Sequence, residues 1–320
     1  MNTFSLFDNG KNPKWKYYII NYLKLLIPPV FYQKRAKRLL WEFPHRADKN
    51  YILDRVDYYN KLKTVTKLDH PVSVSNFKLK DMNQKVYFFD AYPFVRSFPK
   101  HFQFCYAFGD VVHIPESPSI LKSRPIAYNN QNSIILKLDK VRHFVKIKKD
   151  KPFNQKKDRL VFRGKVTYKK KRKKFFEMYF DHPMCDLGDT QQKKINPDKW
   201  KVKKTSVYYL LQYKFILAIE GIDVASNLKW VMSSNSLAVM PKPEYETWFM
   251  EARLIPDYHY VAIKPDYSDL EEKLNYYIEH ENEALQIIKN AQEYVAQFWD
   301  SEREDLISLL VMQKYFNYVR

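Results

Sequence analysis

The sequence predicts an α/β protein built from two α/β halves, and three observations support this. An apolar run at Phe215–Ile219 is followed by a polar turn, a short helical pattern and a second apolar run at Ser236–Met240, which is the order of a βαβ unit. The chain has 320 residues, which is long for a single domain. The charged, proline-containing segment Lys148–Lys157 suits a linker. We therefore expect domains at residues 1–152 and 153–300, and a C-terminal helix at 301–320 that can pack back on the first domain.

The first half is expected to begin with helices and to continue with strands. Tyr17–Ile27 is apolar but too short to span a membrane. Its basic flanks fit either an interfacial amphipathic helix or a helix docked on the core. Residues 36–63 show a helical pattern that breaks near Pro44. Four short apolar runs then predict strands at Lys85–Phe89, Phe104–Phe108, Asp110–Ile114 and Ser133–Leu138.

The second half alternates strand and helix patterns. Besides the βαβ unit, Arg159–Phe162 and Tyr260–Ile263 read as strands, and a helix is expected to open within Lys169–Lys174. Ser268 and Glu271 have the spacing of a capping box at the start of a further helix. Two amphipathic helices are expected near the C-terminus, at Glu283–Phe298 and Glu302–Tyr318.

Charge and cysteine content restrict the compartment and the partners. The net charge of +19, from 55 basic and 36 acidic residues, favours polyanionic ligands or anionic surfaces. Cys105 and Cys185 form neither a metal-ligand spacing nor a disulfide framework. Without a recognisable signal peptide, we expect a reducing cytoplasm.

Two glycine-containing turns are candidates for binding phosphate. Arg163 and Gly164 lie between a predicted strand and a predicted helix, so the glycine admits a close backbone approach and the arginine offers a bidentate fork. The turn from Gly221 to Asn227 precedes another helix, whose free N–H groups favour phosphate. An ordinary crossover in a parallel sheet is the alternative for this turn. The basic run Lys169–Lys174 is typical of a solvated surface.

Asp90 is the candidate for acid–base chemistry. It stands at the carboxyl end of the predicted strand Lys85–Phe89, the edge at which open α/β sheets bind ligands. A carboxylate there is placed to abstract a proton. The alternative is an aspartate that forms a turn or caps a helix.

Several segments together resemble glycosyltransferase family 90, which contains the protein O-glucosyltransferases and bacterial lipopolysaccharide core glycosyltransferases. The bacterial branch of the Pasteurella and Haemophilus type is the more similar. The resemblance extends over roughly residues 87–298. Besides Arg163 and Gly164, it is carried by Lys122–Ile126, Phe215–Gly221, Ser226–Trp230, Pro243–Glu251 and Pro256–Tyr260.

The resemblance implies a GT-B architecture, in which two Rossmann-like domains face each other across a cleft. The first domain would bind the acceptor and the second a nucleotide sugar. The reaction would be inverting, would need no metal and would use no cofactor besides the UDP-sugar donor. Asp90 would be the general base that deprotonates the acceptor hydroxyl, and Arg163 would bind the donor diphosphate.

The resemblance also places further donor-binding residues in the second half. Eukaryotic members have an arginine where Asn227 stands, so Lys229 or the helix N-terminus would supply that charge. Glu246 and Glu251, on a helix expected at Glu244–Met250, would bind ribose or donor hydroxyls. For Glu246, a first-turn acid that complements the helix dipole is an equal alternative. The turn residues expected at the donor are Gly164, Gly221, Ile222, Asp223, Ser226 and Asn227.

Three further side chains are expected to be structural rather than to bind a ligand. We interpret His259 as a hydrogen-bonded histidine at a strand end, and Trp230 and Trp248 as core residues.

These interpretations combine into a cytoplasmic enzyme that is peripheral on the inner face of the inner membrane. It would move glucose or galactose from a UDP-hexose to the inner core of lipopolysaccharide or lipooligosaccharide. Its partners would be the UDP-hexose, the core acceptor and an anionic membrane surface, with no nucleic acid. Two alternatives stay open, namely a basic nucleic-acid-binding protein and a catalytically inactive relative of the family.

Overall fold

The structure is a computed structural model that describes residues 10–191 and 195–320. Residues 1–9, the start of the first predicted domain, lie outside the described part. The described chain groups into two compact units. Unit 1 contains residues 10–12, 141–244 without 192–194, and 252–297, and unit 2 contains residues 13–140, 245–251 and 298–320. The chain leaves unit 2 after Lys140, whereas the sequence predicted a boundary after residue 152, and it re-enters unit 2 twice.

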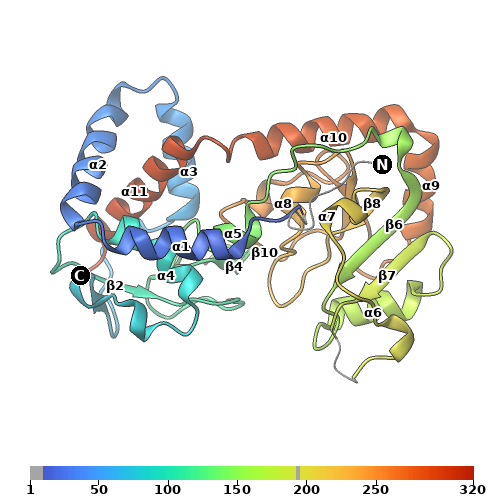
Figure 1. Cartoon of the computed structure of the whole chain (residues 1–320). Helices are drawn as coiled ribbons and strands as arrows, with labels where there is room; N and C mark the ends of the chain where they lie inside the picture. Colours follow the sequence, from blue (N-terminus) through green and yellow to red (C-terminus); the bar gives the residue numbers. More distant parts are fainter. Residues whose placement is uncertain (1–9, 192–194) are drawn as a thin grey trace. The chain divides into compact units, whose positions relative to one another are not determined.

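Unit 1 is built around a sheet of five parallel strands in the order β11-β9-β8-β6-β7. Figure 1 labels β8, β6 and β7 of this sheet. Phe215 of β8 lies opposite Leu160 of β6 on one side and Leu237 of β9 on the other. The parallel βαβ unit predicted between residues 215 and 240 is therefore confirmed. The strands are β6 (Lys157–Gly164), β7 (Cys185–Asp189), β8 (Tyr213–Leu217), β9 (Leu237–Met240) and β11 (Val261–Ala262).

The helices of unit 1 bury their apolar residues against this sheet. Phe175 and Phe176 of α6, together with Leu270 and Leu274 of α9, belong to one core with the strand residues. The α-helices are α6 (Lys170–Tyr179), α7 (Val207–Leu210), α8 (Leu228–Val231), α9 (Leu270–Glu279) and α10 (Glu281–Ala296), and the 3-10 helices are η4 (Phe153–Gln155) and η5 (Asp198–Trp200). Two short helices, α5 (Lys140–His143) and η6 (Glu251–Arg253), start in unit 2 and continue into unit 1.

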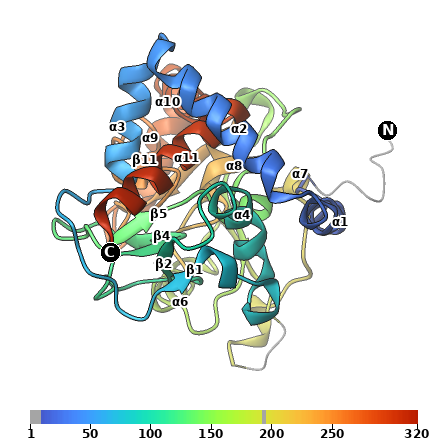
Figure 2. The ribbon, with the colours of Figure 1, turned by 90° about the vertical axis from the view of Figure 1, so that its left-hand side faces the viewer.

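Unit 2 combines a helical layer with small sheets. The helix α11 packs against α2 and α3, and both views show α3 and α11 side by side (Figures 1 and 2). The helical break predicted near Pro44 is confirmed, because η1 separates α2 from α3. The helices are α1 (Lys14–Leu25), α2 (Pro29–Glu42), η1 (Phe43–His45), α3 (Lys49–Tyr59), η2 (Val74–Asn76), η3 (Leu79–Asp81), α4 (Lys85–Val95) and α11 (Ser301–Tyr318).

A buried carboxylate holds the helical layer together. Glu304 of α11 accepts hydrogen bonds from Arg55 of α3, from Lys137 Nζ at 2.9 Å and from Trp248 Nε1 at 2.5 Å. Burial alone would raise the pKa of Glu304, but Lys137 and Arg55 outweigh it and lower that pKa. Charged side chains from three distant segments are thus paired inside unit 2, as buried charges require.

The main sheet of unit 2 has the order β1-β2-β3-β5, with β2, β3 and β5 parallel and β1 antiparallel at the edge. A separate antiparallel pair joins β4 to β10, with Arg124 opposite Glu246. The strands are β1 (Val72–Ser73), β2 (Gln103–Tyr106), β3 (Ser119–Leu121), β4 (Ser123–Pro125), β5 (Ser133–Ile135) and β10 (Tyr245–Thr247).

Three predicted elements are wrong. Lys85–Phe89 is not a strand but the first part of α4, which is buried on most sides, and a short apolar run does not distinguish a strand from a buried helix. Residues 110–114 form a loop after β2. Glu244–Met250 is not a helix, because it contains β10, which pairs with β4. Two residues of β10, the aromatic Tyr245 and the β-branched Thr247, are of types that favour strands.

The predicted capping box is also wrong. The N-cap of α9 is Asp269, without a side-chain capping bond. The Ser268 hydroxyl instead donates to Asp266 Oδ1 at 2.9 Å, within the preceding turn. Ser and Asp side chains often make such local bonds in competition with helix capping.

Candidate active site

The strand order of unit 1 marks one position on its sheet. In chain order, β7 adds to one side of β6, and β8, β9 and β11 add to the other side. The order therefore reverses between β6 and β8. Open α/β sheets bind ligands outside the carboxyl ends of the strands at such a switch point. The two loops that flank it are residues 165–169, after β6, and residues 218–227, after β8.

Arg172 of α6 connects these two loops. Its Nη1 donates to the carbonyl of Lys165 at 2.9 Å, and its Nη2 donates to the carbonyl of Ile219 at 3.0 Å. A Cβ atom on Gly221 would lie 3.1 Å from Arg172 Nη2, so the glycine allows the guanidinium to sit against the second loop. Burial lowers the pKa of Arg172 to about 10, which still leaves the side chain cationic at neutral pH. A half-buried cation therefore lies at the switch point.

The predicted donor ligand Arg163 points to a different neighbour. Its Nη2 forms an ion pair with Asp186 Oδ1 at 2.6 Å, and its Nη1 donates to the carbonyls of Phe162 and Asp186 at 2.9 and 2.7 Å. The Tyr209 hydroxyl accepts a further bond from Nη2 at 3.2 Å. Hydrogen bonds to Tyr213, Arg163 and Tyr209 outweigh burial and lower the pKa of Asp186. Arg163 is therefore held along β7.

Gly164 ends β6 beside a second fixed loop. It pairs with Asp189 of β7, whose Oδ1 accepts from the backbone N–H groups of Val166 and Gln191 at 3.2 and 2.9 Å. Asp189 Oδ2 accepts from Asn196 Nδ2 at 2.8 Å. The loops after β6 and β7 are thus joined by one buried carboxylate.

The predicted phosphate-binding turn lies at the switch point. Gly221 is half-buried and Asp223 is buried, whereas Ile222 and Ser226 are exposed. Asn227 is the N-cap of α8, and its Nδ2 donates to the carbonyl of Leu217 at 2.9 Å, which ties the turn back to the end of β8. Lys229 is fully buried, and α8 is a single turn of four residues. That Lys229 or the N-terminus of α8 supplies the second charge at the donor therefore stays a prediction.

Glu246 and Glu251 lie in unit 2, where both carboxylates are occupied by protein donors. Arg124 Nε donates to Glu246 Oε1 at 2.7 Å, and the Tyr58 hydroxyl donates to Oε2. Glu251 accepts from the backbone N–H of Thr247 at 2.6 Å and from its hydroxyl at 2.9 Å. Both glutamates are buried. This geometry fits a structural role, so ribose binding by these residues stays a prediction.

Asp90 lies in the middle of α4 and is only 3% exposed. Its Oδ1 accepts from the Tyr17 hydroxyl at 2.9 Å, and its Oδ2 accepts from the backbone N–H of Lys140 at 2.9 Å. Burial raises the pKa of Asp90 despite these bonds and the nearby Lys140 charge. A raised pKa suits a general base. However, both carboxylate oxygens of Asp90 already accept hydrogen bonds from the protein, and the buried side chain leaves little access for the hydroxyl of a sugar acceptor.

A second carboxylate, Asp110, has better access. It follows the carboxyl end of β2, and its side chain is 33% exposed. Lys122, directly after β3, donates to Asp110 Oδ1 at 2.6 Å. Since β2 and β3 are parallel neighbours, both residues lie at the carboxyl edge of the sheet, where α/β sheets bind ligands. Asp110 therefore has the position that the sequence analysis assigned to Asp90.

Comparisons with known proteins identify the family of this chain. The sequence profile described as Glycosyl transferase family 90 matches residues 130–319, which is more than half of the chain. O-glucosyltransferase LpsA of Dichelobacter nodosus is 41% identical over 308 residues, which cover 95% of this chain and 95% of that protein. The chain belongs to glycosyltransferase family 90. It is accordingly a glycosyltransferase.

More distant members of the family match shorter segments. Protein O-glucosyltransferase 3 of Homo sapiens is 29% identical over 165 residues, covering 49% of this chain and 32% of the human protein. The rat protein of the same name is 31% identical over 116 residues, covering 36% of this chain and 22% of its own length. The profile match includes all strands and helices of unit 1, whereas Asp90 and Asp110 precede it.

One candidate residue in each unit was not predicted from the sequence, Arg172 in unit 1 and Asp110 in unit 2. Arg172 belongs to the basic run Lys169–Lys174, which was interpreted as solvated, and only its contact with Ile219, 47 residues away, distinguishes it. Asp110 was assigned to a strand. A usable signal for Asp110 was present, because the family segment Lys122–Ile126 contributes the lysine that pairs with it.

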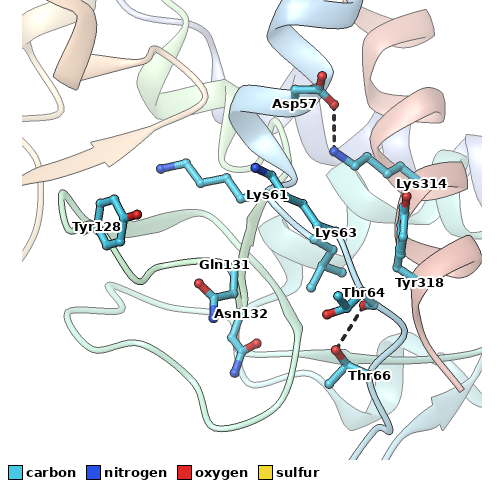
Figure 3. Close-up of a pocket in the computed structure, with 11 residues that line it drawn as sticks. Asp57, Lys61, Lys63, Thr64, Thr66, Tyr128, Gln131, Asn132, Lys314 and Tyr318 are labelled. Carbon is cyan, nitrogen blue, oxygen red and sulfur yellow. Dashed lines mark hydrogen bonds and ion pairs between the residues drawn. The ribbon is translucent and has the colours of Figure 1, made fainter.

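Unit 2 contains a pocket of about 970 Å³ (Figure 3). Gln131 and Asn132 of its wall precede β5, so the pocket is at the amino edge of the sheet. Two of its lysines are bound to protein groups, Lys314 to Asp57 and Lys61 to Asn130. The pocket is therefore separate from the carboxyl edge that carries Asp110. It is lined by Asp57, Lys61, Leu62, Lys63, Thr64, Thr66, Tyr128, Gln131, Asn132, Lys314 and Tyr318.

Within residues 10–191 and 195–320, no cluster of three histidine, cysteine, aspartate or glutamate side chains could hold a metal ion. Across the same residues, no helix has both the length and the apolar character to cross a membrane.

Proposed function

We propose that this family 90 enzyme transfers glucose from UDP-glucose to a hydroxyl of the lipopolysaccharide or lipooligosaccharide inner core, with inversion at the anomeric carbon. The observation that carries the proposal is the 41% identity, over 95% of both chains, to a protein named O-glucosyltransferase LpsA. That name favours glucose over galactose and an oxygen acceptor.

The donor diphosphate would bind at the switch point of unit 1. Arg172 offers a cation beside the turn that starts at Gly221. When the glycosidic bond to the diphosphate breaks, negative charge grows on the leaving UDP, and a fixed cation stabilises it. In a metal-independent reaction, arginine and lysine side chains must supply this charge. Arg163 remains the donor ligand that the resemblance implied, and it would have to exchange Asp186 for phosphate.

The general base would be Asp110 or Asp90, and access favours Asp110. In an inverting reaction, one carboxylate removes the proton from the acceptor hydroxyl as this oxygen attacks the anomeric carbon on the face opposite UDP. Lys122 Nζ forms an ion pair with Asp110 Oδ1 at 2.6 Å and so holds this carboxylate at the edge of the sheet. Asp90 would need to give up the Tyr17 hydroxyl or the Lys140 N–H before it could accept a proton.

The GT-B arrangement and the location are further parts of this proposal. Unit 1 would act as the donor-binding domain and unit 2 as the acceptor-binding domain. The enzyme would work in the cytoplasm, on the inner face of the inner membrane, because its acceptor is attached to lipid. The net charge of +19 suits both a phosphorylated core acceptor and an anionic membrane surface.

The test is a donor panel assayed with a deacylated inner-core oligosaccharide. We expect UDP release and a product heavier by one hexose with UDP-glucose, weaker turnover with UDP-galactose, and no loss of rate with a metal chelator. Turnover with UDP-galactose and not with UDP-glucose would show that the transferred sugar is galactose instead of glucose. No turnover of any UDP-hexose by the folded protein would contradict the proposal.

A further inference from the structure

The helix α1 exposes an apolar stripe to solvent. Trp15, Ile19 and Leu23 repeat every four residues, which places them on one face of the helix. They are 69%, 53% and 58% exposed, and Leu26, just after the helix, is 79% exposed. Large apolar side chains grouped in this way on a surface mark an interaction site.

The other side of α1 is attached to unit 2. The Tyr17 hydroxyl donates to Asp90 Oδ1 at 2.9 Å, and Asn21 is the buried residue of the helix. The rings of Tyr17, Tyr18 and Tyr22 all pack edge-on against Phe89 of α4. The helix is therefore fixed in place by one face, and this leaves the apolar stripe directed away from Phe89.

The stripe continues into the first turn of α2. Ile27, Val30 and Phe31 are 39%, 47% and 59% exposed. Pro28 and Pro29 connect the two helices, with Pro29 at the first position of α2. The apolar surface thus runs from α1 across the turn, and Figure 2 shows these two blue helices meeting at that turn. We call the set Trp15, Ile19, Leu23, Leu26, Ile27, Val30 and Phe31 the apolar stripe.

Basic side chains surround the apolar stripe. Residues 14–42 contain seven lysines and arginines but only one acid, Glu42. Arg35 pairs with Asp305, and Arg38 pairs with Glu42 and Glu302. Within the part of the chain that the structure describes, the remaining lysines of α1 and α2 form no ion pair: Lys14, Lys16, Lys24, Lys34 and Lys37.

We infer that α1 and the first turn of α2 dock on an anionic phospholipid surface. An apolar helical face bordered by lysines, with tryptophan at its edge, buries its side chains at the level of the lipid headgroups while the ammonium groups contact lipid phosphates. The charge disfavours a second copy of this chain as the occupant, because the five lysines without an ion pair would then face the same five lysines. This docking rests on the membrane location in the proposed function and assigns it to particular residues, but lipid binding itself does not depend on the transferase activity.

The experiment is co-sedimentation of the full-length protein with phosphatidylcholine vesicles, with and without phosphatidylglycerol. We expect binding that requires phosphatidylglycerol and weakens with salt. The triple variant Trp15→Ser, Ile19→Ser, Leu23→Ser should bind at least tenfold more weakly. Replacing Lys14 and Lys16 by glutamine should weaken binding by about fivefold for each lysine.

Matched controls separate the stripe from a general surface effect. Val65→Ser removes an apolar side chain that is 53% exposed elsewhere in unit 2, and Lys63→Gln removes an exposed lysine there. Neither should change vesicle binding. The triple variant should keep wild-type turnover of a deacylated, soluble acceptor, since the apolar stripe touches no candidate catalytic group.

Two outcomes would overturn the inference. The first is equal binding of wild type and triple variant to anionic vesicles. The second is no vesicle binding together with a dimer in sedimentation velocity that the triple variant dissociates, which would identify a second copy as the occupant. Vesicle binding by a protein without transferase activity would instead contradict the proposed function and leave this inference standing.

Discussion

We expect donor binding to depend most on Arg172. It spans the two loops of the switch point and stays cationic although burial lowers its pKa to about 10. Because its remaining N–H groups are at the edge where α/β sheets bind phosphates, its loss should act on the nucleotide. Its neighbour Lys173, on the same basic run, pairs with Glu177 and is 59% exposed.

Arg172→Ala should weaken UDP binding by about 10- to 100-fold, the range expected for charge-assisted hydrogen bonds. Isothermal titration with UDP measures this directly. Arg172→Lys should recover part of the affinity, since the charge returns without the planar fork. Lys173→Ala is the control and should bind UDP normally. An Arg172→Ala protein that is folded and binds UDP with wild-type affinity would remove Arg172 from the site.

Asp110 and Asp90 give opposite expectations for the general base. Asp110→Asn should lower kcat by about 10²- to 10⁴-fold and leave the UDP dissociation constant unchanged. Asp90→Asn should mainly change stability, because Asp90 is buried and bonded to Tyr17 and Lys140. Steady-state kinetics of both variants decide between them. If Asp90→Asn abolishes transfer and Asp110→Asn does not, Asp90 is the base and the assignment to Asp110 is wrong.

At the scale of elements, the β4–β10 pair depends on one buried ion pair. The Glu246 carboxylate of β10 accepts hydrogen bonds from Arg124 of β4 and from the Tyr58 hydroxyl of α3. Glu246→Ala leaves Arg124 buried without its partner, which should cost about 3–5 kcal/mol of unfolding free energy. Glu244→Ala, two residues earlier and 62% exposed, should change it by less than about 0.5 kcal/mol. Chemical denaturation measures both. An unchanged stability for Glu246→Ala with a raised KM for donor would favour the ribose-binding role.

The turn before β11 carries a pH-sensitive contact. His259 is buried, and its Nδ1 accepts from the backbone N–H of Ile255 at 2.9 Å. Burial lowers its pKa from the ordinary value of 6.5, so the folded state keeps it neutral while the unfolded chain takes up a proton. Stability should therefore be complete above pH 6.5 and fall as the pH drops through and below that value. In denaturation curves at several pH values, His259→Gln should show a smaller loss than wild type. An identical pH dependence of the two proteins would contradict this contact.

Elements with a strong local pattern could be predicted from the sequence. The strands β8 and β9 are short buried runs on either side of a glycine-containing turn, and α10 and α11 have long amphipathic patterns. The helix α4 could not be predicted, because the short apolar run after Lys85 fits a buried strand as well as a buried helix.

The candidate site was predicted less completely, because its residues are selected by tertiary contacts. The turn after β8 was found from its glycine. Arg172 was not, since nothing local separates it from the lysines on either side, and only the fold brings it to Ile219. Asp90 was predicted because it was expected at the carboxyl end of a strand. In the structure Asp90 lies in α4, and it is Asp110 that follows the carboxyl end of a strand, β2.

At the scale of the whole molecule, the basic residues behind the net charge of +19 have several roles. Some cations are buried in ion pairs, such as Arg55 with Glu304. In the two proposals, Arg172 would bind the donor diphosphate, and the lysines of α1 and α2 would contact lipid phosphates. Nucleic-acid binding would instead need a continuous basic surface with a recognisable module. Membership of family 90 and the distribution of these cations favour the transferase.

The stereochemistry of the product tests the central claim most directly. The sugar of UDP-glucose is α-linked, and an attack opposite the diphosphate must give a β-glucoside. Proton NMR of the oligosaccharide formed by wild-type protein from UDP-glucose and deacylated inner core reads the anomeric configuration of the new residue. We expect a β-glucosyl residue attached through oxygen to the core. An α-glucosyl product would show retention and would contradict single-displacement chemistry with a carboxylate base.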